Sequence, residues 1–144
     1  MDIALDLANK SEHNFKHAAL IVKGNKILCH GHNRYTHGRN VGNINSYHAE
    51  ECTINKCSFK ELKGSTMYIA RIASYGPAFS KPCQRCQLVL KSTGIKKVFF
   101  SSEEGIYCML IWWMSYNKDN WGLFLTTFLD IFYEMCVCTL FQHN

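Results

Sequence analysis

The sequence predicts one α/β domain in which helices pack on the faces of a sheet. A chain of 144 residues is long enough to bury a core of its own, and its hydrophobic fraction of 47% and charged fraction of 19% are typical of globular proteins. Helical and strand patterns follow one another in the order helix, strand, strand, helix, strand, helix, strand. This order favours a sheet covered by helices.

The first elements are a short helix and a β-hairpin. Apolar residues recur at helical spacing over residues 3–8, before a polar run at 9–12, and this apolar stripe is expected to cover the sheet. Two β-prone runs follow, at 18–22 and 27–30. A Gly-Asn pair lies between them at 24–25 and suits a tight turn, so the two runs predict antiparallel strands.

A second helix is predicted after a loop rich in Gly and Asn over residues 31–45. Ser46 suits its N-cap, and Glu50 and Glu51 are favourably placed in its first turns. We expect this helix to run from about Tyr47 to Lys56.

The next elements are a strand over 67–72, a loop over 74–77 and a third helix. Pro82 suits a first helical position and Gly94 the residue just past a helix end. These two residues bracket a helix of about three turns, and residues 98–100 predict the strand that follows it.

Charge divides the chain into two parts. Residues 1–106 hold fifteen Lys and Arg against eight acids, whereas residues 107–144 hold one Lys, three acids and many aromatic side chains. We therefore predict a core domain over 1–106 and an apolar extension over 107–144, packed on the core or at a subunit interface. Residues 123–142 nearly match a membrane span in length, but Asp130 and Glu134 near their middle oppose insertion.

Export and nucleic-acid binding are both disfavoured by the composition. The first residues carry acids where a signal peptide needs a basic start, so we expect an intracellular, cytoplasmic protein whose eight cysteines bind metal or stay reduced. The net charge of +5 suits a phosphate-bearing substrate, a nucleic acid or simple solubility. The basic residues form no stripe with interleaved aromatics, which makes nucleic acid the lesser alternative.

Two short motifs carry the chemistry. His48-Ala49-Glu50 begins one predicted helix, and Pro82-Cys83-Gln84-Arg85-Cys86 begins the next. The intervening strand returns the chain to the same end of the sheet, so the two helix N-termini can face one point. Cys83 and Cys86 then share a helix face, and His48 adds an imidazole. Helix N-termini also favour the thiolate that binds zinc, so we expect lowered thiol pKa values and a three-ligand Zn²⁺ site.

Glu50 completes a catalytic site of this kind. Three protein ligands leave the fourth position of zinc for water, whose pKa zinc lowers to about 7. Glu50 lies two residues after His48 and suits a proton shuttle. In the reaction that such a site can catalyse, Glu50 takes a proton from the water, and the hydroxide attacks the carbon that bears the exocyclic amine of a base. Glu50 then delivers protons to the ring nitrogen and to the departing ammonia. The product would be a uracil-type base.

These motifs resemble the His-x-Glu and Pro-Cys-x-x-Cys pattern of the cytidine deaminase-like superfamily of zinc hydrolases. The resemblance runs from about Ile3 to Ser101 and is greatest to deoxycytidylate (dCMP) deaminases. It implies a three-layer α/β/α fold with a central mixed sheet, a homo-oligomer, and a cytosine nucleotide or nucleoside, of the dCMP or cytidine type, as substrate. Further stretches contribute to the similarity: 19–22, 31–33 and 94–98.

The resemblance also implies substrate contacts. Asn33 matches the asparagine that touches the sugar in relatives, and Ala49 is expected to touch the substrate. Arg34 either binds a 5′-phosphate or is a solvated charge. Further residues of the same region either contact substrate or lie at the surface: His30, His32, His37 and Arg39.

Three alternatives stay open. Cys52 or Cys57 could close a four-ligand structural zinc site. Core positions explain the four cysteines that remain outside the zinc motif, namely Cys29, Cys108, Cys136 and Cys138. The enzyme could deaminate a purine, such as guanine or a tRNA adenosine, with the same metal and carboxylate. The fold could also serve as a non-catalytic zinc-binding interaction module.

Overall fold

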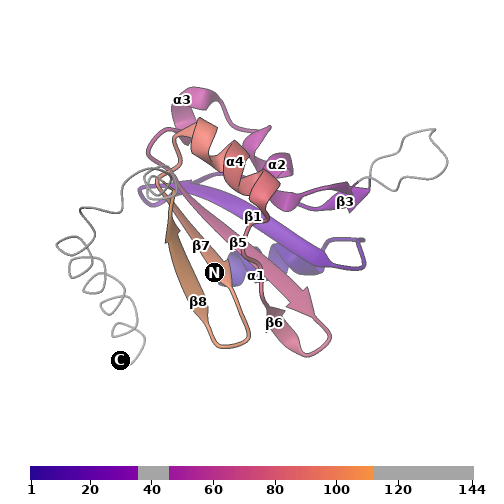
Figure 1. Ribbon diagram of the computed structural model, residues 1–144. Coiled ribbons are helices and arrows are strands. Elements are labelled where there is room, and N and C mark those ends of the chain that lie inside the picture. The colour runs from indigo at the N-terminus through magenta and orange to yellow at the C-terminus, as the bar shows by residue number, and fades with distance from the viewer. Residues whose placement is uncertain (36–45, 112–144) are drawn as a thin grey trace. The chain divides into compact units, whose positions relative to one another are not determined.

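The computed structural model describes residues 1–35 and 46–111, which belong to one compact unit that ends at Ile111 (Figure 1). Its elements are, in chain order, α1 (Asp2–Asn9), β1 (Lys16–Lys23), β2 (Lys26–His32), β3 (Arg34–Tyr35), β4 (Ser46–Tyr47), α2 (Ala49–Ile54), α3 (Phe59–Leu62), β5 (Thr66–Ala73), β6 (Gly76–Ala78), α4 (Gln84–Thr93), β7 (Lys97–Ser101) and β8 (Ile106–Leu110).

A mixed sheet forms the middle layer of this unit. Its strands lie in the order β2-β1-β5-β7-β8, with β6 paired to β5. β5 and β7 are parallel, and the other pairs are antiparallel. Helix α1 covers one face of the sheet, and α2 and α4 lie on the other (Figure 1). The predicted three-layer α/β fold is thereby confirmed.

The face under α1 holds a small hydrophobic cluster. Ala4 of the helix packs against Leu20 of β1 and Ala70 of β5, all of them buried. The predicted apolar stripe therefore does cover the sheet. Ile3 departs from it, because its side chain is 54% exposed.

The opposite face holds α2 close to β1 and β2. Thr53 is fully buried, and its hydroxyl donates to the carbonyl of Ala19 on β1 at 3.1 Å. A Cβ added to Gly31 of β2 would lie only 3.0 Å from the Thr53 hydroxyl and 3.2 Å from Cys52 Cβ. Glycine at position 31 therefore lets α2 approach the sheet closely.

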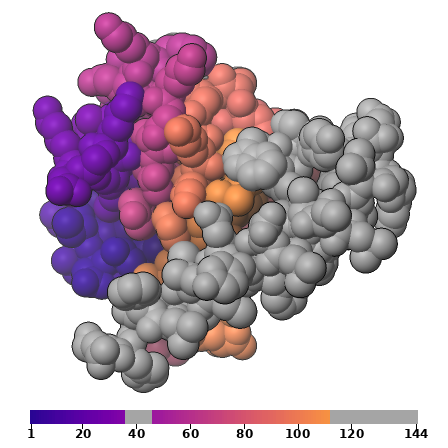
Figure 2. Space-filling view, turned by 90° about the vertical axis from the view of Figure 1, so that its left-hand side faces the viewer, coloured from indigo at the N-terminus to yellow at the C-terminus, as the bar shows by residue number. Residues whose placement is uncertain are grey.

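The N-terminal boundary of α2 differs from the prediction. Ser46 is not its cap, because Ser46 and Tyr47 form β4, which pairs with β3. His48 is the N-cap instead, with extended backbone angles of φ −71° and ψ 152°. A capping box is found one helix later, at Ser58 and Glu61 of α3. The segment around α3 protrudes at the surface (Figure 2), where the Phe59 side chain is 66% exposed.

The next loop and helix also begin differently from the prediction. Residues 74–77 are not all loop, since Gly76 and Pro77 pair with β5 as part of β6. Pro82 lies before the cap of α4 and not at its first position, because Cys83 is the N-cap. The C-terminal prediction is correct: Gly94 follows the helix in the left-handed region, with φ 76°.

β8 was absent from the predicted order. It pairs with β7 from Ile106 to Leu110, so the predicted domain boundary after residue 106 falls inside this strand. Its five residues are all apolar and show no alternation with polar residues, so the sequence does not mark them as a separate strand. The rest of the proposed extension, including residues 123–142, lies outside the described residues. Within residues 1–35 and 46–111, no helix is both long and apolar enough to cross a bilayer.

Candidate active site

Two helix starts meet at one end of the sheet. The β3–β4 pair leads the chain into His48, the N-cap of α2, and the segment after β6 leads it into Cys83, the N-cap of α4. Both N-caps are extended, which places their side chains before the first helical turn. α2 and α4 also contact each other directly.

A buried serine holds the segment that leads to Cys83. The Ser80 hydroxyl donates to the carbonyl of Ile69 at 3.0 Å and lies 3.0 Å from the Ser101 hydroxyl. Both serines are almost completely buried, and the amide of Ser101 donates to Ser80 Oγ at 2.9 Å. This network ties the segment to β5 and β7, three residues before Cys83.

The predicted zinc ligands come together. His48 Nδ1 lies 3.2 Å from Cys86 Sγ and 3.6 Å from Cys83 Sγ, and the three ligand atoms all lie within 4.8 Å of one another. Tetrahedral zinc with ordinary Zn–N and Zn–S bond lengths requires an N···S separation of about 3.6 Å. The donor set therefore fits a zinc ion. Among the described residues, this is the cluster of His, Cys and acidic side chains with metal-binding geometry.

The pKa of the Cys86 thiol departs from the prediction. The helix start was expected to lower it, but burial raises it well above its ordinary value, and the neighbouring Glu50 and Cys83 raise it further. Cys86 is fully buried, so loss of solvation outweighs the helix dipole. In this environment the Cys86 thiolate needs a bound cation to stabilise it.

Glu50 lies beside the cluster without belonging to it. Its side chain is 6% exposed, and burial raises the pKa of its carboxyl above the ordinary value. Its backbone hydrogen bond, the nearby His48 and a hydrogen bond with Cys86 act in the opposite direction. A buried carboxyl that adjoins the ligands but lies outside their group has the placement of a general acid and base.

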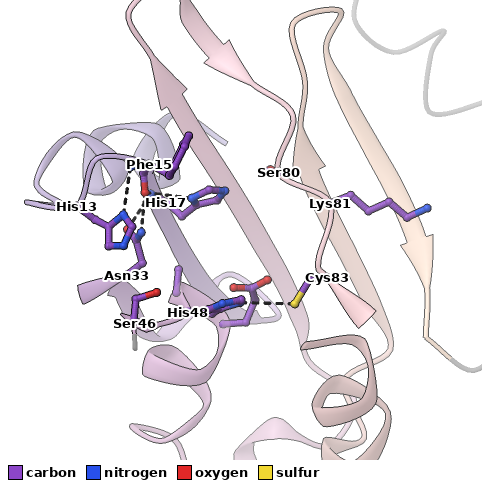
Figure 3. A pocket seen from close by; sticks show the side chains of 11 residues that line it. His13, Phe15, His17, Asn33, Ser46, His48, Ser80, Lys81 and Cys83 are labelled. Carbon is purple, nitrogen blue, oxygen red and sulfur yellow. Dashed lines mark hydrogen bonds between the residues drawn. The ribbon is translucent and has the colours of Figure 1, made fainter. Parts of the chain in front are cut away.

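The cluster opens into a cavity of about 270 Å³ (Figure 3). The Glu50, His48 and Cys83 side chains form its metal-binding end. The other lining residues come from the loop before β1, from β1, β4, the end of β2, the start of α2 and the segment before α4: His13, Phe15, His17, Asn33, Ser46, Ala49, Ser80 and Lys81.

Asn33 and Ala49, two of the predicted substrate contacts, line this cavity. The Asn33 amide also organises the segment before β1. Its Nδ2 donates to the carbonyl of Phe15 at 2.6 Å, and its Oδ1 accepts from Ser11 Oγ at 2.7 Å and from the His17 amide at 2.9 Å. Asn33 thus has a structural role in addition to its place in the wall.

Arg34, the third predicted substrate contact, is not among the lining residues. Its guanidinium lies over the Tyr47 ring, 5.4 Å from the ring centre, and interacts with Cys52. His30 and His32 also lie away from the cavity wall. The remaining candidates, His37 and Arg39, fall outside the described residues.

The structure does not support a fourth protein ligand from the nearby cysteines. Cys57 forms a disulfide with Cys29, which was predicted to be an ordinary core thiol. Cys52 lies outside the metal-binding group, and burial raises its pKa. Among the described residues, a zinc ion held by this cluster would have three protein ligands, which would leave one position for a non-protein ligand.

Several wall residues carry no motif in the sequence that relates them to the site. His13, Phe15 and His17 precede a strand without any spacing that relates them to the zinc motifs, and Ser80 and Lys81 precede Pro82. Only pairing of β1 with β5 brings the first group beside the second. Their proximity to predicted strand ends is the one clue available from the sequence.

The fold and the site together define an enzyme of the zinc deaminase class. Enzymes of this class are hydrolases. The family model described as "Cytidine and deoxycytidylate deaminase zinc-binding region" matches residues 1–102, and the chain belongs to this family. No curated protein matches the sequence significantly.

Several solved structures have a low similarity to this chain. The apo dCMP deaminase of the cyanophage S-TIM5 is 23% identical, with a TM-score of 0.48 over 69% of this chain and 79% of that chain. Its complex with dCMP and dUMP gives 23% identity and a TM-score of 0.47 over 69% and 73%. Acinetobacter baumannii RibD is 22% identical, with a TM-score of 0.45 over 69% of this chain and 26% of that chain.

Proposed function

We propose that this protein hydrolyses the exocyclic amine of a cytosine nucleotide or nucleoside, of the dCMP or cytidine type, and releases the uracil form and ammonia. The observation that carries the proposal is the placement of Glu50: a buried carboxyl at the same end of one cavity as a His-Cys-Cys cluster of zinc-binding dimensions. The family to which the chain belongs supports a cytosine-type base.

His48, Cys83 and Cys86 would hold Zn²⁺. When bound there, zinc supplies an acidified water as the nucleophile at neutral pH. Cys86 and Glu50 are buried, which strengthens the charge interactions around them, whereas Cys83 is exposed at the same end of the cavity.

Glu50 moves the protons. Its carboxylate accepts a proton from the attacking water and delivers it to the ring nitrogen beside the reacting carbon. A second transfer through the same carboxyl carries the remaining proton of that water to the departing amine, which leaves as ammonia while the oxygen becomes the carbonyl of the uracil form. The group thus acts as base and then as acid. A pKa raised by burial suits the second role, because the protonated form is then accessible near neutral pH.

Asn33 and Ala49 support the substrate at the wall of the cavity. One Nδ2 hydrogen of Asn33 binds Phe15, and we assign the other to an oxygen of the substrate sugar. We assign no phosphate contact to Arg34, because its guanidinium is engaged over Tyr47. Assembly with further copies of the chain and a cytoplasmic location stay predictions.

The test is ammonia release by the zinc-loaded full chain with cytosine, cytidine, deoxycytidine and dCMP, alongside guanine and adenosine. Glu50→Gln is the control, and it should lower the rate at least about 100-fold while zinc stays bound. Turnover of purines alone would reject the cytosine assignment. Zinc binding without turnover of any compound would indicate an interaction module.

A further inference from the structure

We propose that His17 binds the substrate, and that its Nε2 atom accepts a hydrogen bond from a sugar hydroxyl of the cytosine nucleoside or nucleotide. This inference rests on the proposed function, because it concerns the same cavity. It assigns a residue that neither zinc motif contains.

His17 lies in the cavity wall and is the second residue of strand β1. It pairs with Arg71 of β5 and lies on the same face of the sheet as Ala19, which is the face that α2 covers. Figure 3 shows its ring extending from β1 into the space above His48 and Cys83. The side chain thus lies between the metal-binding end and the outer residues of the cavity.

The hydrogen bonding of the His17 ring fixes which nitrogen faces the substrate as an acceptor. Nδ1 lies 3.2 Å from the carbonyl oxygen of Phe15, and a carbonyl oxygen can only accept, so Nδ1 carries the hydrogen. Burial lowers the pKa of His17, which favours the neutral ring. In the neutral ring with the hydrogen on Nδ1, Nε2 has a lone pair, and this atom has no partner among the described residues.

Two other polar groups of the outer wall have partners within the chain. The Ser80 hydroxyl bonds to Ile69 and Ser101, and Nδ1 of His13 accepts the amide hydrogen of Phe15. The Lys81 side chain points away from His48 and Cys83 (Figure 3). His17 Nε2 is therefore a hydrogen-bond acceptor in the cavity wall that a donor of the substrate can reach.

In a cytosine nucleoside, only one kind of hydrogen-bond donor is left for His17 Nε2. The base carries hydrogen-bond donors only on its exocyclic amine, and the proposed reaction places this amine beside Glu50. The remaining donors are the hydroxyls of the sugar. Asn33 lies next to His17, since its Oδ1 accepts the His17 amide hydrogen, so one hydroxyl can accept from Asn33 Nδ2 and donate to His17 Nε2.

The test compares deoxycytidine with 1-methylcytosine, in which a methyl group replaces the sugar. His17→Leu removes the acceptor, His17→Gln retains one, and His30→Leu is the control, because His30 is an exposed histidine away from the cavity. We expect His17→Leu to lower kcat/KM for deoxycytidine about threefold to tenfold, mainly through KM, and to change that for 1-methylcytosine less than twofold. His17→Gln should recover most of the loss.

A second comparison uses 2′,3′-dideoxycytidine. This compound lacks the sugar hydroxyl at the 3′ position, so the kcat/KM of the wild type should be lower for it than for deoxycytidine by a similar factor. The kcat/KM of His17→Leu for 2′,3′-dideoxycytidine should equal that of the wild type, because the hydrogen bond is absent in both. Equal losses of His17→Leu on deoxycytidine and 1-methylcytosine would show a structural role and overturn the inference, as would no loss on either.

The proposed function is judged separately, by whether the wild type turns over any cytosine compound. If it turns over none, the His17 variants are compared by calorimetry for binding of deoxyuridine against 1-methyluracil. Loss confined to deoxyuridine supports the contact, whereas equal binding of deoxyuridine by the wild type and His17→Leu, or no binding by either, overturns it.

Discussion

Arg85 of α4 donates a 2.7 Å hydrogen bond to Glu51 of α2, so an ion pair joins the two helices whose first residues carry the zinc-ligand candidates. Each partner is next in sequence to a candidate site residue, Cys86 and Glu50 respectively. The pair therefore couples the two halves of the site through the helix starts.

This ion pair should contribute little to overall stability. The Arg85 side chain is 66% exposed, so we expect Arg85→Ala to lower the free energy of unfolding by only about 0.5 kcal/mol. A double-mutant cycle with Glu51→Gln, measured by urea unfolding, should give a coupling that shrinks in 1 M salt. A coupling that is unchanged by salt would contradict the electrostatic account.

Ser80 should contribute more to stability than this ion pair, although it contacts none of the candidate zinc ligands. Ser80→Ala leaves the Ile69 carbonyl and the Ser101 amide without their buried partner, at a cost of about 1–3 kcal/mol. Urea unfolding measures the loss. Ser92→Ala is the matched control, because this exposed serine of α4 bonds only to its own helix, and it should change stability by less than about 0.5 kcal/mol. Equal effects of the two substitutions would refute the role of the Ser80 network.

The disulfide between Cys29 and Cys57 predicts a stability that depends on redox conditions. It closes a loop of 28 residues, which corresponds to about 3.5 kcal/mol in the chain-entropy model. Cys57→Ser should therefore destabilise the oxidised protein by roughly this amount and leave the reduced protein nearly unchanged. Thermal unfolding with and without dithiothreitol is the measurement, and a wild type insensitive to the reductant would argue against the bond.

Zinc affinity should fall steeply with acid. Burial raises the pKa of the Cys86 thiol, so binding of zinc must displace its proton. Each displaced proton lowers the apparent affinity about tenfold per unit decrease in pH, which competition with a chromogenic chelator at pH 6, 7 and 8 can measure. Cys86→Ala should bind zinc more weakly and with a shallower dependence on pH. An affinity that is constant over this range would mean that the thiols are already ionised.

His17 should make folding sensitive to pH. Its pKa is lowered in the folded protein, chiefly by burial, so the unfolded chain binds more protons as the pH falls below the ordinary value near 6.5. The stabilising contribution of the neutral ring is therefore complete above that pH and is lost as the pH falls through the lowered value. Between pH 7.5 and 5.5, urea unfolding should show a smaller loss of stability for His17→Gln than for the wild type. The opposite order would mean that the folded environment favours the charged ring.

Local chemistry made the elements and the metal site predictable. The 3.6-residue period of α1, the Gly-Asn turn between β1 and β2 and the glycine after α4 act over a few residues, so the sequence displays them directly. The ligand set was predictable for the same reason. The three-residue interval between Cys83 and Cys86 sets their shared face on any helix, and His48 and Glu50 lie within one turn of each other.

Boundaries were less predictable where backbone pairing competed with capping preferences. Ser46 has the chemistry of a helix cap, yet its backbone pairs with Tyr35, and the cap moves to His48. Pro77 suits a loop, but pairing with Ile72 at the edge of β5 places it in a strand. In both cases a partner distant in the sequence decides the outcome.

By itself the sequence determined the α/β fold class and singled out the three side chains that cluster as candidate zinc ligands, with the carboxylate beside them. Only the tertiary structure decided which other residues share the cavity, that Arg34 lies outside it, that Cys29 pairs with Cys57 and that the Cys86 thiol has a raised pKa. The physical reason is that motifs depend on spacing along the backbone, whereas burial, cross-strand neighbours and solvation depend on which distant segments pack together.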